Sequence, residues 1–167
     1  MSDLVKFRIP VPFVLARLLP TPAELGYGFE HGWIGENEAI GLALAMYEEC
    51  EVPPEIEEIA LLLADEAWRV PELIDRAKGS AGDDGSRAWL FVALAWVAEN
   101  QDDFLDPYEA IEMLYADFGY PDAIAGLVRF IPPPPGEPVG MTALDARWRA
   151  YLKAESDWFS ARRRGPS

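Results

Sequence analysis

The stretch RAWLFVALAWVAEN, residues 87–100, decides the fold class of this chain. Eleven consecutive apolar residues run from Ala88 to Ala98, so a helix formed here is apolar on every side. Such a helix is buried at the centre of a protein or within a membrane. Because a membrane span needs about 20 apolar residues, we predict a central, buried helix with Trp89 and Trp96 in the core.

On both sides of this stretch, apolar residues recur with helical spacing. Ile111, Leu114, Tyr115 and Phe118 fall at i, i+3, i+4 and i+7, which places them on one helical face. The alternation that is typical of strands does not extend over a useful length. We therefore predict an all-α fold, a single compact domain of about eight helices in antiparallel hairpins, with a proline-linked C-terminal helix.

Proline and capping residues set the expected helix ends. The pattern Thr21-x-x-Glu24 predicts a capping box. The apolar spacing predicts one continuous helix over about 55–68, which buries Leu63, and a further helix over about 121–131. Beyond it, Pro132–Pro138 favours a stiff polyproline II spacer. This predicts three parts, namely an acidic helical domain over 1–131, a proline-rich linker over 132–140 and a basic C-terminal helix and tail over 141–167.

Charge is divided unevenly along the chain, which has a net charge of −15. Residues 1–140 carry 8 basic and 26 acidic side chains, whereas residues 141–167 carry 6 basic and 3 acidic ones. The basic helix is therefore expected to fold back onto the acidic body or to dock onto a second copy, which would give a homodimer. The acidity argues against direct binding of nucleic acid, which needs basic patches.

The sequence lacks the features of a secreted or membrane-bound protein. A single cysteine, Cys50, allows no disulfide within the chain, and the N-terminus lacks the pattern of a signal peptide. We expect a cytoplasmic protein with no membrane contact.

Motifs of the common cofactor and nucleophile classes are missing, so we expect no cofactor and no enzymatic activity. His31, the only histidine, is interpreted as a helix C-terminal residue. Cys50 is expected to be half-buried and a poor nucleophile because Glu48, Glu49 and Glu51 surround it.

The alternative to a non-enzymatic protein is a divalent-metal hydrolase. Two groups of carboxylates have a better spacing for metal binding than adjacent carboxylates have. These groups are Glu51/Glu55/Glu58 and Asp102/Asp106/Glu109.

Aromatic residues are abundant, and their roles differ. Trp89 and Trp96 are expected in the core, whereas for Trp33, Trp68, Trp148 and Trp158 the sequence leaves core and interface roles open.

Four blocks of sequence carry a resemblance to a known family. In order they are Gly28–Ile34, Trp89 with Leu94–Trp96, Tyr115–Pro121 and Arg129–Pro132. Over about residues 7–133 the chain resembles a bacterial family of small uncharacterised helical proteins, associated with immunity genes beside polymorphic contact-dependent toxins. The resemblance implies no catalytic residues, and it implies that the linker and the basic helix are an addition to the family.

The motif residues are interpreted as structural. Gly28 and Gly32 permit tight turns or close packing, and the Tyr115–Pro121 block is expected to form a corner between helices, where a contact role for Asp117 is the alternative. The motif residues are Gly28, Gly32, Trp33, Tyr115, Asp117, Phe118, Tyr120 and Pro121.

The resemblance and the acidic body together lead to a functional hypothesis. We expect a non-catalytic immunity protein that binds and blocks a basic toxin domain, since an acidic surface steers association with a basic cleft. The hydrolase remains one alternative, and a helical scaffold or self-assembly module is another. The expected partner-binding residues are Glu48, Glu49, Glu51, Glu55, Glu57 and Glu58, followed by Asp102, Asp103 and Asp106.

Overall fold

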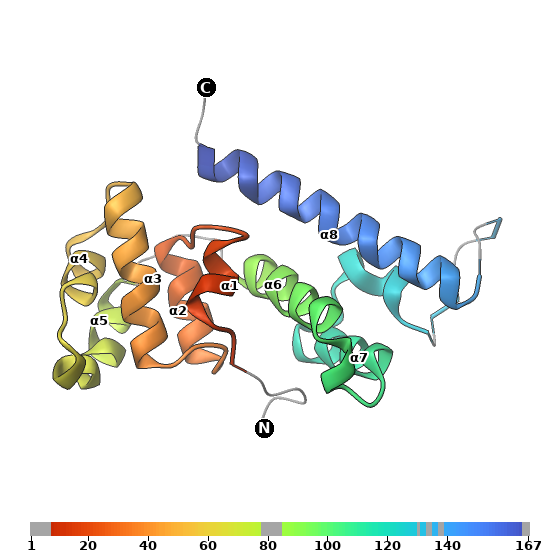
Figure 1. Ribbon diagram of the computed structural model, residues 1–167, viewed down its shortest axis with the longest axis horizontal. Helices are drawn as coiled ribbons and strands as arrows, with labels where there is room; N and C mark the ends of the chain where they lie inside the picture. The colour runs from red at the N-terminus through yellow and green to blue at the C-terminus, as the bar shows by residue number, and fades with distance from the viewer. Residues whose placement is uncertain (1–7, 78–84, 130, 133–134, 137–138, 165–167) are drawn as a thin grey trace. The chain divides into compact units, whose positions relative to one another are not determined.

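The computed structural model describes residues 8–77, 85–129, 131–132, 135–136 and 139–164 (Figure 1). Within these ranges the chain forms eight α-helices and three 3-10 helices and no strand, so the all-α prediction is confirmed. No helix in the described part of the chain is long and apolar enough to cross a membrane.

The chain divides into two compact units between Trp89 and Leu90. We call Lys6–Trp89 the N-terminal unit and Leu90–Ser167 the C-terminal unit. The three-part division expected around the proline-rich segment stays a prediction, and residues 133–134 and 137–138 of the expected linker lie outside the described residues.

The N-terminal unit is built around α3. Leu42, Ala43 and Met46 of this helix are fully buried, and α3 packs side by side with α4, with additional contacts to α1, α2, η1 and α5 (Figure 1). The elements of this unit are α1 (Val11–Leu15), α2 (Pro22–Glu30), α3 (Glu36–Glu49), α4 (Pro54–Ala60), the 3-10 helix η1 (Ala64–Arg69) and α5 (Val70–Ala77).

The predicted capping box at the start of α2 is confirmed. Thr21 Oγ1 accepts a hydrogen bond from the Glu24 amide at 3.2 Å, and Glu24 Oε1 accepts one from the Thr21 amide at 3.0 Å. The Glu24 side chain is buried. Because its carboxylate accepts from the Thr21 amide, it also fixes the direction in which the chain enters α2.

The expectation of one helix over 55–68 is wrong, because α4 ends at Ala60 and η1 begins only at Ala64. Leu63 has extended backbone angles, φ −81° and ψ 162°, and its amide donates to Glu66 Oε1 at 3.0 Å instead of to a helical carbonyl. The break reverses the expected burial: Leu62 lies in the core, and Leu63 is exposed.

Most of α6, the helix predicted to be central, belongs to the C-terminal unit. Phe91, Val92, Leu94 and Val97 of α6 are buried, as the all-round apolar pattern predicts. The helix starts within the N-terminal unit and continues across the division. The elements are α6 (Ser86–Glu99), the 3-10 helix η2 (Gln101–Asp103), α7 (Pro107–Asp117), the 3-10 helix η3 (Asp122–Leu127) and α8 (Met141–Arg164).

The helix expected over 121–131 is only the 3-10 helix η3, so this expectation is also wrong in type and length. Val128 has extended angles, φ −97° and ψ 121°, directly after η3. Gly126 is a poor helix former, and Pro132 disfavours helical angles in Ile131, so the segment cannot propagate as an α-helix.

The basic helix α8 packs against the rest of the C-terminal unit through aromatic contacts and hydrogen bonds. The ring of Phe159 stacks on Phe91 with centroids 5.4 Å apart. Trp148 meets Tyr108 edge to face at 5.6 Å, and the Tyr108 hydroxyl donates to Asp145. Arg147 Nε donates to the carbonyl of Gly126 at 2.8 Å. The apolar face of α8 is therefore used within its own unit.

Candidate protein-binding surface

The first family motif forms a glycine-terminated ending of α2. The Gly32 amide donates to the Phe29 carbonyl at 3.2 Å, and the Trp33 amide donates to the Gly28 carbonyl at 2.9 Å. Gly32 has a φ of 81°, a left-handed conformation that favours glycine. These two bonds define a Schellman motif. His31 is the C-cap residue, and its Nδ1 lies 2.9 Å from the Tyr27 carbonyl oxygen.

The second motif forms the same ending on α7. The Gly119 amide donates to the Ala116 carbonyl at 3.1 Å, and the Tyr120 amide donates to the Tyr115 carbonyl at 2.8 Å. Gly119 and Tyr120 both have positive φ, 78° and 62°. The rings of Tyr115 and Tyr120 meet edge to face at 5.3 Å, which is the apolar contact that accompanies this motif.

The other residues of this block extend the corner. Asp117 is the last residue of α7, Phe118 is its C-cap, and Pro121 is the N-cap of η3. These residues therefore form the corner between α7 and η3. A contact role for Asp117 stays a prediction.

Gly28 has a second role, in packing. A Cβ atom at this position would lie 2.2 Å from Trp89 Cζ2, so only glycine allows the indole ring to approach α2 this closely. The Trp89 Nε1 group donates to the Glu24 carbonyl at 2.6 Å across the same contact. The motif therefore joins a helix end to the first turn of α6.

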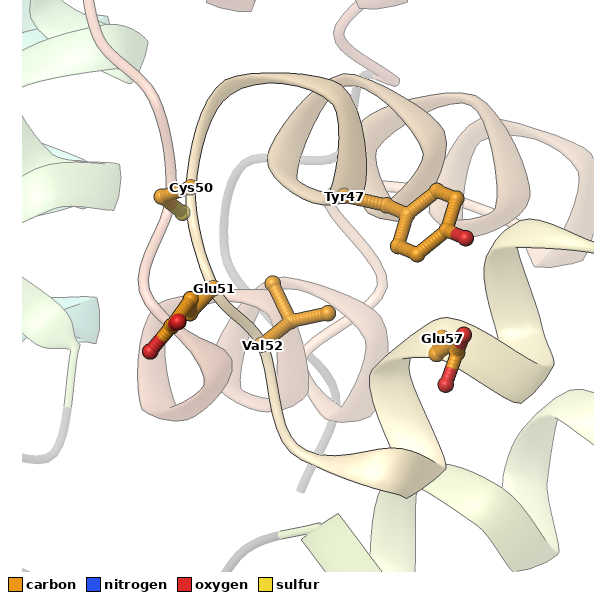
Figure 2. Close-up of a pocket in the computed structure, with 5 residues that line it drawn as sticks. All are labelled: Tyr47, Cys50, Glu51, Val52 and Glu57. Carbon is orange, nitrogen blue, oxygen red and sulfur yellow. The ribbon is translucent and has the colours of Figure 1, made fainter.

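The leading candidate residues gather where α3 meets α4. Figure 2 shows a hollow at this corner, with Tyr47 on α3, Glu57 on α4 and Val52 on the segment that connects them. The hollow has a volume of about 340 Å³ and is lined by Tyr47, Cys50, Glu51, Val52 and Glu57. Two carboxylates beside a tyrosine ring suit a cationic side chain, through charge-assisted hydrogen bonds and a cation–π contact.

Most of these carboxylates are exposed at the surface. Glu48, Glu49, Glu51 and Glu57 are exposed, and Glu55 is half-buried. Glu58 is also exposed, but it forms an ion pair with Arg69 of η1, so part of its charge is neutralised within the chain. The group therefore remains strongly anionic as a whole.

The surrounding sequence supplies no compensating charge. No lysine or arginine occurs between Arg17 and Arg69, whereas twelve carboxylates lie in that interval. This imbalance is a signal that sequence reasoning could have used to mark the N-terminal unit as the anionic one.

The second candidate group lies in the C-terminal unit and is only partly available. Asp102 and Asp103 are exposed on η2. Asp106 instead caps α7, because its Oδ1 accepts from the Tyr108 amide at 3.1 Å and its Oδ2 lies 2.9 Å from Arg129 Nη2. Arg129 also donates to Glu112 at 2.8 Å, so Asp106 belongs to an internal network.

Neither group of carboxylates considered for the hydrolase, Glu51/Glu55/Glu58 or Asp102/Asp106/Glu109, forms a metal-binding cluster. Among the described residues, no three His, Cys, Asp or Glu side chains come together in a way that could hold an ion.

Cys50 is exposed and not half-buried as expected, because α3 ends at Glu49 and Cys50 follows as its C-cap with extended backbone angles. Its thiol donates to the Met46 carbonyl at 3.2 Å.

Sequence reasoning missed most of the exposed apolar residues of the N-terminal unit. Three large apolar side chains are exposed at the break between α4 and η1 or on η1 itself, and two more, Leu44 and Tyr47, are exposed on α3. We call Leu61 and Leu63 at the break, together with Trp68 near the end of η1, the apolar edge. Leu63 continues the spacing of Ile56 and Ile59 and so also fits a buried helical face, whereas for Trp68 the sequence left core and interface roles open.

Comparison with known proteins gives a family and no further relative. Residues 12–156 match a family described as an uncharacterized protein conserved in bacteria (DUF2247). The match includes the proline-rich segment and most of α8, so the expectation that the resemblance ends near residue 133 and that the last helix is an addition is wrong. No curated protein and no solved structure matches the chain.

Proposed function

The chain belongs to the DUF2247 family of uncharacterized bacterial proteins, and we propose that it is a non-catalytic, cytoplasmic immunity protein that binds and blocks a basic toxin domain. The observation that supports this most directly is the anionic corner of α3 and α4. Its exposed carboxylates stand in a unit that has no lysine or arginine from residue 18 to residue 68.

Physical chemistry connects this surface to the proposed partner. Toxin domains that act on nucleic acid need a basic cleft to hold the phosphate backbone. A fixed anionic surface accelerates encounter with such a cleft by roughly 10- to 1000-fold at low salt, and it competes with the phosphates for the same cations. The hollow beside Tyr47 would receive one cationic side chain of the partner.

The first test is capture of the partner. The tagged protein is purified from its native cells at low and moderate salt, and the proteins that elute with it are identified by mass spectrometry. We expect a basic toxin domain at about one copy per chain. If a partner is captured and it is neither basic nor toxic to cells that lack this protein, the immunity proposal is wrong.

The second test locates the surface. In the variant Glu51→Gln/Glu57→Gln the association rate with the captured toxin should fall by about 10-fold at low salt, and its salt dependence should weaken. The matched control is Glu30→Gln/Glu36→Gln, which removes the same charge from exposed residues at the end of α2 and the start of α3. Equal rates for the two variants would show that net charge matters and that the corner does not.

A further inference from the structure

The apolar edge places three large exposed apolar side chains within a short stretch of the chain. Leu61, Leu63 and Trp68 lie within eight residues and are 59%, 66% and 70% exposed. Single exposed apolar residues are common on protein surfaces and need no explanation. A cluster with a polar surround, in contrast, marks an interaction site.

The local fold holds these side chains outward in a fixed arrangement. Ala60 before the segment, Leu62 within it and Val70 after it are buried, which anchors the segment along its length. Inside it, the amide of Leu63 is bonded to Glu66, and Arg69 at the end of η1 is paired with Glu58 of α4. Side chains on a segment that is already ordered lose little conformational entropy when a partner binds.

The charges around the edge select the kind of partner. Glu57 and Asp65 are exposed on either side of Leu61 and Leu63, and Glu66 is half-buried. Arg69, the next basic residue in the sequence, is engaged by Glu58. An apolar strip bordered by carboxylates is complementary to an apolar strip bordered by lysine or arginine. An anionic lipid surface would be repelled.

We propose that the apolar edge is the docking site for the apolar face of a basic amphipathic helix of another protein. The proposal deepens the immunity function and rests on it for the identity of the partner. The carboxylates set the rate of encounter, and burial of Trp68 with its two leucines sets the lifetime of the complex.

Helix α8 of this chain is itself basic and amphipathic, but α8 of a second copy is not the expected occupant. Leu144, Trp148 and Phe159 of α8 are buried in the C-terminal unit. Docking through these residues would require α8 to leave its unit, at the cost of its contacts with Phe91 and Tyr108.

The test uses the full chain and a synthetic probe. The probe is a fluorescent lysine/leucine helix with leucine at i, i+3, i+4 and i+7, and its partner peptide has the same composition in scrambled order. Fluorescence anisotropy gives the dissociation constant of each peptide. The amphipathic probe should bind at least 10-fold more tightly than the scrambled peptide, because both have the same charge and only one presents an apolar face.

Two variants complete the design. Trp68→Ala should weaken binding of the probe by about 30-fold, the size that is typical of a central aromatic contact. Leu105→Ser is the matched control, since Leu105 is fully exposed and also lies beside carboxylates, Asp103 and Asp106. Among the described residues, no other large exposed apolar side chain lies within eight positions of it in the sequence. Leu105→Ser should change binding by less than about 2-fold. Far-UV circular dichroism checks that both variants fold.

Each outcome decides the proposal separately from the proposed function. Equal binding of the two peptides, or no effect of Trp68→Ala, overturns the apolar edge as a docking site. Self-association of the chain that Trp68→Ala abolishes also overturns it, in favour of a second copy. If the captured toxin binds Trp68→Ala as tightly as it binds the unaltered chain, the immunity function stands and this inference fails. If the probe results hold but no toxin is captured, the immunity function fails alone.

Discussion

Substitution of Gly28 by alanine tests the contact that joins α2 to α6. The new Cβ would lie 2.2, 2.4 and 2.8 Å from Trp89 Cζ2, Cε2 and Nε1. Carbon atoms pack at about 3.5–4.0 Å, so the rigid indole would have to move by more than about 1 Å. Trp89 is 2% exposed, so other protein atoms enclose the ring that would have to move.

The expected effect is the balance of three contributions. Overpacking costs about 1–3 kcal/mol, and a displacement of this size belongs at the upper end. Loss of the bond from Trp89 Nε1 to the Glu24 carbonyl adds about 1 kcal/mol. Alanine in a helix recovers about 1 kcal/mol relative to glycine. The free energy of unfolding should therefore fall by about 3 kcal/mol.

The assay is urea denaturation of the full chain, followed by far-UV circular dichroism and by tryptophan fluorescence so that coincidence of the two transitions can be checked. A loss of about 3 kcal/mol also corresponds to a decrease in Tm of roughly 6–12 °C. The control is Gly126→Ala, whose Cβ would meet Arg147 Cδ at an ordinary 3.5 Å. It should change the unfolding free energy by no more than about 1 kcal/mol.

A double-mutant cycle identifies the cause. In a Trp89→Leu background the ring is gone, so Gly28→Ala should cost less than about 1 kcal/mol. If Gly28→Ala leaves stability unchanged, or costs the same in both backgrounds, the steric argument for this glycine is refuted.

Three further predictions follow from single contacts. Gly119→Ala should lower the unfolding free energy by about 1–2 kcal/mol through backbone strain alone, because its φ is 78° and nothing lies within 4 Å of the new Cβ; an unchanged urea midpoint would contradict this. Thr21→Ala removes the cap of α2 and should cost about 1 kcal/mol, whereas Thr21→Ser should restore most of it in the same assay. Burial, and then the hydrogen bond and charge of Asp145, raise the pKa of Tyr108 well above its ordinary value. The folded state therefore keeps a proton that the unfolded chain releases above about pH 10, so stability should fall as pH rises past that value, and less steeply in Tyr108→Phe; parallel pH profiles would argue against the contact.

Local signals predicted a large part of the fold. The all-round apolar pattern of residues 87–100 predicted α6, and the Thr21–Glu24 pair predicted the start of α2, because each depends on residues that lie within a few turns of one another. The break after Ala60 was not predictable in the same way. Leu62 and Leu63 have the same apolarity, and only packing against the neighbouring helices decides which one is buried.

For the candidate site, too, some features were predictable from the sequence and others depended on the tertiary structure. The anionic character of residues 48–58 follows from composition, and the structure places these carboxylates on neighbouring ends of α3 and α4. Sequence could not show that Glu58 is paired with Arg69, eleven residues away, or that Asp106 is held by Arg129. Long-range pairs of this kind depend on how the helices turn back on one another.

The sequence alone determined the helical class, several helix ends and the sign of the surface charge, since periodicity, capping and ionisation are local properties. The tertiary structure decided that Gly28 must lack a side chain, that Leu63 and Trp68 face solvent, and that α8 buries its apolar face in its own unit. Each of these depends on which atoms meet across distant parts of the chain, and burial of apolar surface there outweighs local preference.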